Sequence, residues 1–103
     1  MPLYQDAVAA ECIFPLNNAE VRFCLVEDQE QVDKMLEIKD GLPLLEHVIY
    51  DDPRGLRHYN QTFLHGLDEV LEMGRIHDSN HPDFLGNAID KGRPEAVAVT
   101  LYT

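Results

Sequence analysis

Acidic residues follow two of the apolar segments in this sequence, and they are the first candidates for chemistry. Glu27 and Asp28 come directly after one apolar segment, and Asp51 and Asp52 come directly after the next. Carboxylate oxygens are ligands that suit Mg²⁺, and strands that end at one edge of a sheet can bring such groups together. The two pairs therefore raise the hypothesis of a magnesium-dependent phosphoacceptor site.

Structural roles explain the same residues more simply. Asp28 stands where a helix N-cap would, with Gln31 three residues later in a capping-box arrangement. Asp51 and Asp52 open the segment Asp51–Gly55, whose proline and glycine are typical of a turn. We favour these structural roles for both acidic pairs.

The functional alternative resembles the receiver domain of response regulators, in which an acidic pair holds Mg²⁺ beside a phosphoacceptor aspartate. Asp51 or Asp52 would be the phosphoacceptor in this chain. The last apolar segment ends in Leu101-Tyr102-Thr103 without the lysine that would pair with a phosphoryl group, and a strand between the acidic pair and the phosphoacceptor is missing. A free-standing receiver-like or other non-enzymatic binding domain stays open as the alternative function.

His77 and His81 are four residues apart, a spacing at which a helix can present two metal ligands on one face. The segment Ser79–Pro82 is typical of a helix start, which argues against one continuous helix across both histidines, and no HExxH arrangement surrounds them. We therefore expect exposed loop histidines and no metal site. The other histidines show no spacing of a nucleophile and its base: His47, His58 and His65.

The charge balance argues against whole classes of partner. The 103 residues contain 8 Lys and Arg against 19 Asp and Glu, which gives a net charge of −11. Affinity for nucleic acid and for anionic membranes depends on clustered Lys and Arg, so neither is an expected partner. The acidic residues between positions 27 and 40 are expected to form a solvated face.

Residues Met1–Asp6 contain neither the basic region nor the apolar core of a secretion signal. No apolar run in the sequence approaches the ~20 residues that span a bilayer. We therefore expect a cytoplasmic protein in which Cys12 and Cys24 are reduced and buried as small hydrophobic residues. A disulfide between the two cysteines is the less favoured alternative.

Helical and extended patterns alternate along the chain. Helices are expected over residues 6–18 with a kink or early stop at Pro15, from Asp28 to Gly41, over 63–74 and over 80–92. Strands are expected over 21–26, 44–50 and 96–102, with residues 1–4 as a fourth strand at an edge. Residues 56–62 are expected to form an irregular loop.

The alternation of strands and helices predicts right-handed crossovers and a parallel sheet. The expected fold class is α/β: a three-layer, mostly parallel sheet of about four strands with helices on both faces. Such a fold is a partial Rossmann-like subdomain, and it takes up residues 1–103 as one unit.

The segment Ala96–Thr103 resembles the strand that leads into the phosphate-binding loop of AMP-forming acyl-CoA synthetases, members of the adenylate-forming superfamily. In that family the strand continues as Tyr-Thr-Ser-Gly-Thr-Thr-Gly, of which the opening Tyr102-Thr103 is present here. Residues 45–59 are similar to the strand and loop that precede this motif in long-chain fatty-acid ligases. Residues 1–23 resemble the earlier helix and strand of the family, and residues 63–74 resemble its short helix that ends in glycine.

The resemblance implies a long-chain fatty-acid–CoA ligase that uses ATP, Mg²⁺ and CoA to convert a fatty acid into acyl-CoA, AMP and pyrophosphate. Thr103 would be the first hydroxyl of the ATP phosphate-binding loop, and no catalytic or metal-binding residue is expected in this chain. The chain would be a fragment of the N-terminal AMP-binding domain, inactive and without bound cofactor by itself. Its partner would be the rest of the parent synthetase, a cytoplasmic or peripheral membrane enzyme.

A scaffolding role follows from the resemblance. Val97, Val99 and Leu101 would be buried in the final strand and would aim the phosphate-binding loop at ATP. The expected neighbours of that strand are Phe23, Leu25, Val48 and Ile49. This interpretation requires residues 96–102 to lie in the central sheet. A partial sheet also leaves a face or an edge uncovered, so we expect self-association in solution.

Overall fold

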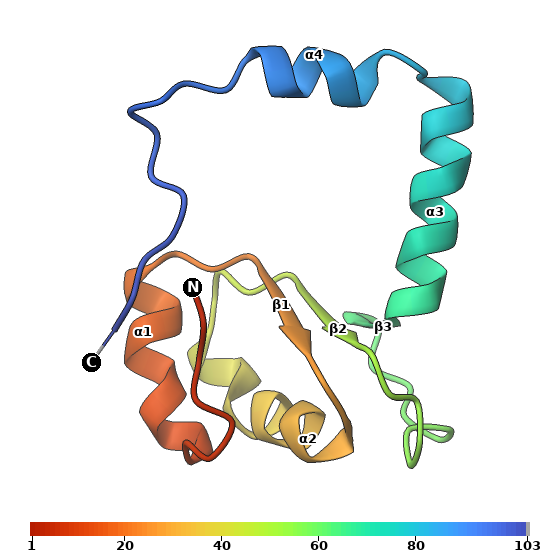
Figure 1. Cartoon of the computed structure of the whole chain (residues 1–103). Helices are drawn as coiled ribbons and strands as arrows, with labels where there is room; N and C mark the ends of the chain where they lie inside the picture. Colours follow the sequence, from red (N-terminus) through yellow and green to blue (C-terminus); the bar gives the residue numbers. More distant parts are fainter. Residues whose placement is uncertain (103) are drawn as a thin grey trace.

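The computed structural model describes residues 1–102 and has a three-stranded parallel sheet at its centre (Figure 1). Helices lie on both sides of this sheet, which confirms the predicted α/β class. The elements, with η for a 3₁₀-helix, are η1 (Ala9–Cys12), α1 (Ile13–Asn18), β1 (Phe23–Val26), α2 (Gln29–Ile38), η2 (Lys39–Gly41), β2 (His47–Tyr50), β3 (Leu64–Gly66), α3 (Leu67–Asn80) and α4 (Phe84–Asp90).

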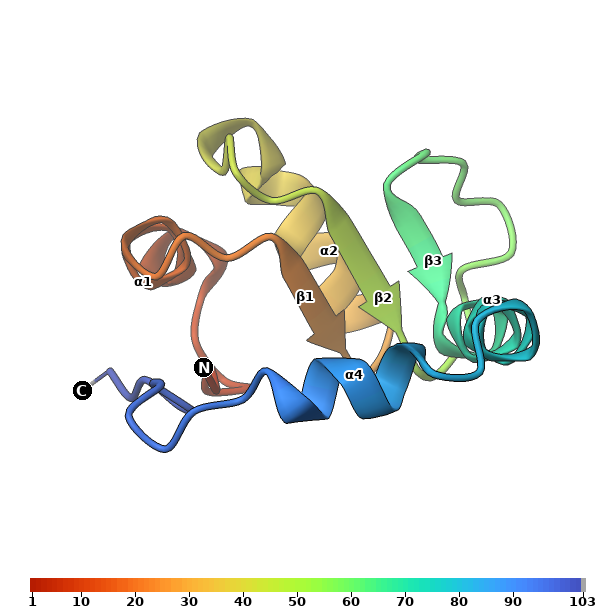
Figure 2. The ribbon, with the colours of Figure 1, turned by 90° about the horizontal axis from the view of Figure 1, so that it is seen from above.

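The sheet is built in chain order, β1-β2-β3, and all of its pairs are parallel. Cys24 lies opposite Val48, and Val48 lies opposite Leu64. Helix α2 connects β1 to β2 and covers one face of the sheet (Figure 2). These two strands and the helix between them are the elements that the sequence predicts most accurately.

The core fills the space between α2 and the sheet. Val32, Leu42 and Val48 are the largest fully buried side chains. Along α2, Val32, Met35 and Ile38 are buried together because residues three apart lie on one face of a helix. Burial of each such side chain contributes about 1.5–3 kcal/mol, so this interface holds the sheet and α2 together.

Pro15 does not interrupt the N-terminal helix. The chain forms the 3₁₀ turn η1 and then continues as α1 through Pro15 to Asn18. Pro15 lies in the first turn of α1, where a backbone N–H has no acceptor within the helix and its loss is tolerated. The expected kink or stop at this position is therefore wrong.

Helix α1 ends on a residue in the left-handed conformation. Glu20 has φ of 55°, and its N–H donates to the carbonyl of Asn17. The N–H of Val21 donates to the carbonyl of Leu16 at 3.0 Å, which completes a Schellman motif. Glycine is the residue that usually occupies this position, so the sequence carries no signal for this helix end.

The expected strand over residues 96–102 is not present, and the sheet has three strands rather than about four. Val97, Val99 and Leu101 are 83%, 58% and 72% exposed and lie outside the central sheet. The segment instead approaches α1, where the Tyr102 hydroxyl accepts a hydrogen bond from Asn18 at 2.6 Å. A β-branched apolar sequence becomes a strand only when a neighbouring strand pairs with its backbone, and this segment does not reach one.

Residues 1–4 also form no strand in the described part of the chain, which corrects the expected edge strand. The third strand is β3, and it lies within residues 63–74, where the sequence predicts a helix, so the start of that helix was predicted wrongly. Three residues are too few to show the alternation by which a strand is recognised. Helix α3 then runs through Gly74 to Asn80, because nothing crowds Gly74 and one exposed glycine costs a helix only about 1 kcal/mol.

Helices α3 and α4, which we call the arm (residues 67–90), stand away from the core. Every residue of the arm is described, and none is buried. The accessible surface is 7995 Å², against about 5,900 Å² for a compact monomer of this mass. The radius of gyration is 15.5 Å, against about 13 Å for a compact chain of this length. None of the helices described is both long and apolar enough to cross a membrane.

Candidate functional site

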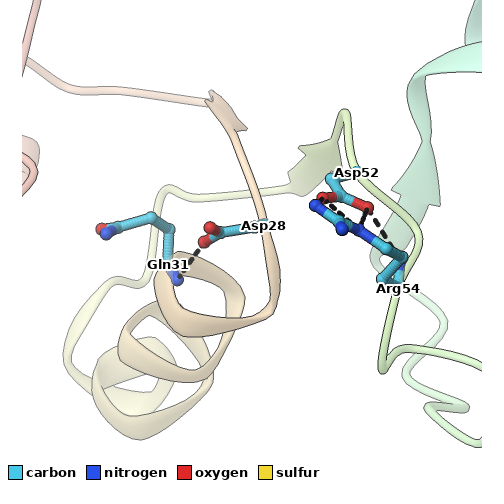
Figure 3. A network of polar contacts seen from close by, with 4 residues as sticks. All are labelled: Asp28, Gln31, Asp52 and Arg54. Atoms are coloured by element: carbon cyan, nitrogen blue, oxygen red, sulfur yellow. Dashed lines mark hydrogen bonds and ion pairs between the residues drawn. The ribbon is translucent and has the colours of Figure 1, made fainter.

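The two acidic segments meet at the carboxyl edge of the sheet (Figure 3). The N–H of Asp51 donates to the carbonyl of Val26 at 3.0 Å, and the N–H of Asp52 donates to the carbonyl of Glu27 at 2.7 Å. These bonds extend the pairing of β1 and β2 beyond both strands. Backbone pairing therefore places the two acidic segments side by side.

Asp28 has a structural role at this edge. Its carboxylate accepts a hydrogen bond from the backbone N–H of Gln31 at 3.4 Å, and its backbone is extended. This is the geometry of a helix N-cap, which satisfies one of the unpaired N–H groups in the first turn of α2. The predicted capping role of Asp28 is confirmed.

Asp52 is held by Arg54. Its Oδ1 accepts from the backbone N–H of Arg54 at 3.0 Å, which closes a local turn. Its Oδ2 lies 2.6 Å from Nη2 of Arg54 and 2.9 Å from Nε, so the guanidinium grips the carboxylate with two nitrogens. The hydrogen bonds from Arg54 lower the pKa of Asp52 below its ordinary value. Asp52 is therefore an ionised turn residue, as predicted.

A shallow hollow of about 360 Å³ lies beside these groups, lined by Asp28, Gln29, Glu30, Asp52, Arg54 and Gly55. Gly55 adopts φ of 80°, and a Cβ at this position would approach Oε1 of Gln29 to 2.2 Å. Gln29 donates to the hydroxyl of Tyr59 at 3.0 Å, and that hydroxyl donates to Asp33 at 2.7 Å. Tyr59 thus fastens the loop that follows the turn to α2.

A phosphoacceptor site needs carboxylates that are free to bind Mg²⁺ and a phosphoryl group, and the carboxylates at this edge are mostly engaged elsewhere. Asp28 is engaged by the helix cap and Asp52 by Arg54, while Asp51 is exposed. Within residues 1–102, no three His, Cys, Asp or Glu side chains lie close enough to hold a metal ion together. The groups at this edge close a turn and cap a helix, and their surface is acidic.

The histidines of α3 stack on each other. His77 lies in the last turn of α3, and the ring of His81, which caps that helix, stacks on it with centroids 4.3 Å apart. Nδ1 of His81 lies 3.1 Å from the backbone carbonyl of His77, so this nitrogen donates to the backbone. Both residues are exposed, as predicted, although His77 is helical and not in a loop.

A second histidine pair was not evident from the sequence. Nδ1 of His47 lies 3.0 Å from Nε2 of His65, on the face of the sheet opposite α2. The ring of His47 also stacks on Phe23, with centroids 5.5 Å apart. Residues 47 and 65 come together through the parallel register of β2 and β3, and only knowledge of β3 could have predicted their contact.

Both cysteines are free and buried, as predicted. Cys24 packs with its Sγ 3.8 Å from Sδ of Met35, and burial raises the pKa of its thiol to about 11. A cavity of about 440 Å³ adjoins them between β1, α2 and residues 1–5. Lys34 lines this cavity and donates to the carbonyl of Gln5 at 2.6 Å. The thiols are therefore protonated core groups rather than nucleophiles.

The proposed nucleotide contact, Thr103, lies outside the described residues. Its neighbour Tyr102 packs edge-on against Phe14, with ring centroids 6.5 Å apart. The final segment thus ends beside α1 rather than at the carboxyl edge of the sheet.

Comparison with known proteins identifies one informative relative. No protein-family model matches the chain, and no solved structure matches it. Among curated proteins, the chain is similar to the long-chain-fatty-acid–CoA ligase ACSBG2 of Xenopus laevis, with 29% identity over 103 residues. The match takes in 98% of this chain and 13% of the relative. The chain therefore spans a small part of the length of the relative that it matches.

Proposed function

We propose that this chain is part of an AMP-forming long-chain fatty-acid–CoA ligase. The proposal rests on the similarity to the Xenopus ligase, which extends over 98% of the chain. The parallel α/β architecture is compatible with it, because ligand-binding loops of such enzymes follow the carboxyl ends of parallel strands. The resemblance implied that residues 96–102 form a sheet strand leading into the phosphate-binding loop, and these residues lie outside the sheet. The assignment to a ligase therefore rests on the similarity to the Xenopus protein alone.

The carboxyl edge of the sheet does not suit the anionic phosphate groups of ATP or CoA. The carboxyl edge carries Glu27, Asp28, Asp51 and Asp52, which repel a polyphosphate, and the guanidinium of Arg54 is already paired with Asp52. We therefore assign nucleotide and thiol binding to other parts of the ligase, with the Thr103 hydroxyl as the proposed contact from this chain. By itself the chain is expected to be inactive.

The test is the activity of the natural reading frame that contains these residues. Fatty-acid-dependent exchange of pyrophosphate into ATP, followed by formation of a CoA thioester, is expected for that protein and not for residues 1–103 alone. A Val48→Asp variant of the full protein should lose activity through loss of folded protein, because Val48 is completely buried. Glu37→Gln, on the exposed side of α2, is the matched control and should remain active.

Absence of both reactions in the full protein would overturn the proposal. The binding-domain alternative has its own readout in the isolated chain. Incubation with acetyl phosphate and Mg²⁺ should leave Asp51 and Asp52 unmodified, and a stable phosphoaspartate detected by mass spectrometry would favour the receiver-like alternative instead.

A further inference from the structure

We infer that Cys12, Cys24 and Met35 form a binding site for one Cu(I) ion at the cavity between β1, α2 and residues 1–5. All three side chains line this cavity, and all three belong to one cluster of buried residues. The inference concerns side chains of this chain alone and does not depend on the proposed ligase.

The sulfur atoms of the chain are concentrated at this cavity. The sequence contains two cysteines and three methionines, and four of these five residues line the cavity: Met1, Cys12, Cys24 and Met35. Cys12 ends η1, Cys24 lies in β1 and Met35 lies in α2. The fold thus brings sulfur atoms from separate elements to one place, which is what a metal site built from sulfur ligands needs.

The spacing of the sulfur atoms suits a single metal ion. Sγ of Cys24 lies 3.8 Å from Sδ of Met35. Two sulfur ligands of one tetrahedral ion, each about 2.3 Å from it, lie about 3.8 Å apart. Cys12 is brought to the same region because η1 packs against α2, and a charge on Cys12 raises the pKa of the Cys24 thiol. The three sulfur atoms therefore lie around one part of the cavity.

The chemistry of these ligands selects the metal. Thiolates and thioethers are soft ligands, and Cu(I) is a soft ion that binds both. Structural Zn²⁺ sites use thiolates, histidines and carboxylates, and Mg²⁺ and Ca²⁺ prefer oxygen. Among the described residues that line the cavity, Glu27 is the only carboxylate and none is a histidine. A ligand set of two thiols and a thioether therefore favours Cu(I) over the harder ions.

Binding releases the protons of both thiols. Burial raises the pKa of Cys24 to about 11, so its thiol is protonated before the ion enters. Each cysteine sulfur then gives its proton to water and bonds to the ion, so that Cu⁺ and two thiols yield a dithiolate complex of charge −1 and two H⁺. The thioether of Met35 joins as a neutral ligand, and no oxidant or reductant takes part. Lys34 lines the cavity, and its positive charge offsets that of the complex.

Competition with the chelator bicinchoninate under anaerobic conditions tests the inference, with Cu(I) as the probe. The 103-residue chain is expected to take about one ion per chain from the chelator. Cys24→Ala should weaken this binding at least about a hundredfold and Met35→Leu about tenfold, since loss of a group that only orients a ligand already costs about 10–100-fold. X-ray absorption at the copper edge should show sulfur as the only type of ligand.

Met73→Leu is the matched control, because it makes the same chemical change at a methionine that is 62% exposed on the arm. This variant should bind Cu(I) like the parent chain. Met35→Leu nearly conserves the volume of the side chain and should keep the fold, as circular dichroism can show, so it decides the matter even if Cys24→Ala unfolds.

The unfolded chain separates a folded site from two free thiols. In urea both cysteines are still present, but Met35 is no longer held beside them, so affinity for Cu(I) should fall at least about tenfold. No uptake by the parent chain, equal affinity of the parent and Met35→Leu, an equal loss in Met73→Leu, or undiminished affinity in urea would each overturn the inference. None of these outcomes bears on the ligase assay.

Discussion

At the scale of single residues, the end of α1 depends on a conformation that glutamate rarely adopts. Glu20 has φ of 55° inside a complete Schellman motif. The left-handed conformation destabilises an L-residue by roughly 1–2 kcal/mol, and it does not destabilise glycine. We expect Glu20→Gly to raise the free energy of unfolding by about 1 kcal/mol, measured by urea denaturation.

The control for this change is glycine in an ordinary helical position. Glu37→Gly in the exposed face of α2 should lower the free energy of unfolding by about 0.5–1 kcal/mol, because glycine loses more backbone freedom there. Destabilisation by both substitutions would show that Glu20 is not in the left-handed conformation in solution.

Arg54 should control the titration of Asp52. The pKa of Asp52 is lower in the folded protein than in the unfolded chain because Arg54 donates hydrogen bonds to its carboxylate. A lowered folded pKa means that the interaction stabilises the fold above the unfolded pKa and is lost as the pH falls through the folded pKa. Arg54→Ala should return the pKa of Asp52 toward its ordinary value, as measured by NMR of the carboxyl carbon.

Arg57→Ala, three residues further along, is the control and should leave the titration of Asp52 unchanged. If Asp52 titrates alike in the parent and in Arg54→Ala, the ion pair of Figure 3 does not form in solution.

The site illustrates which residue roles can be predicted from sequence. The cap at Asp28 was predictable because capping is local and depends on a residue type and a spacing of three. The turn at Asp52 was predictable for the same reason. The hydrogen bonds from the Arg54 guanidinium to both carboxylate oxygens were not, because they depend on the turn geometry. The contact of His47 with His65 depends on strand register, which no local pattern reveals.

At the scale of elements, the segments with tertiary partners are the ones that the sequence predicts well. Strands β1 and β2 and helix α2 pack on one another. Their buried faces are apolar, so the spacing of apolar residues in the sequence predicts these elements. Residues 96–102 have an equally apolar and β-branched pattern, yet they form no strand, and all but Tyr102 are exposed. Pattern alone shows that a segment can be buried, and the availability of a neighbouring strand decides whether it is.

This difference predicts unequal effects of two core-like substitutions. Leu42→Ala should lower the free energy of unfolding by about 2–5 kcal/mol, because Leu42 is fully buried and its truncation leaves a cavity. Val99→Ala should change it by less than about 0.5 kcal/mol, because Val99 is largely exposed. Thermal and urea denaturation of both variants measure the two values. A large loss in Val99→Ala would place residues 96–102 back in the folded core.

At the scale of the whole molecule, the two thiols report on the integrity of the core. Cys12 and Cys24 are buried, and the pKa of Cys24 is raised to about 11 by burial. At about pH 8 the folded chain should therefore react with Ellman's reagent at least about a hundredfold more slowly than the urea-unfolded chain, with both cysteines at a similar rate. A Val8→Cys variant should add one fast-reacting thiol, and rapid reaction of the parent chain would contradict the closed core.

The order β1-β2-β3 has a consequence for synthesis on the ribosome. Each strand pairs with the strand that was made just before it, so the sheet can grow one strand at a time as the polypeptide emerges. Residues 1–50 contain the first strand pair and the α2 crossover. The nascent chain is therefore suited to fold vectorially, with the arm translated after these elements.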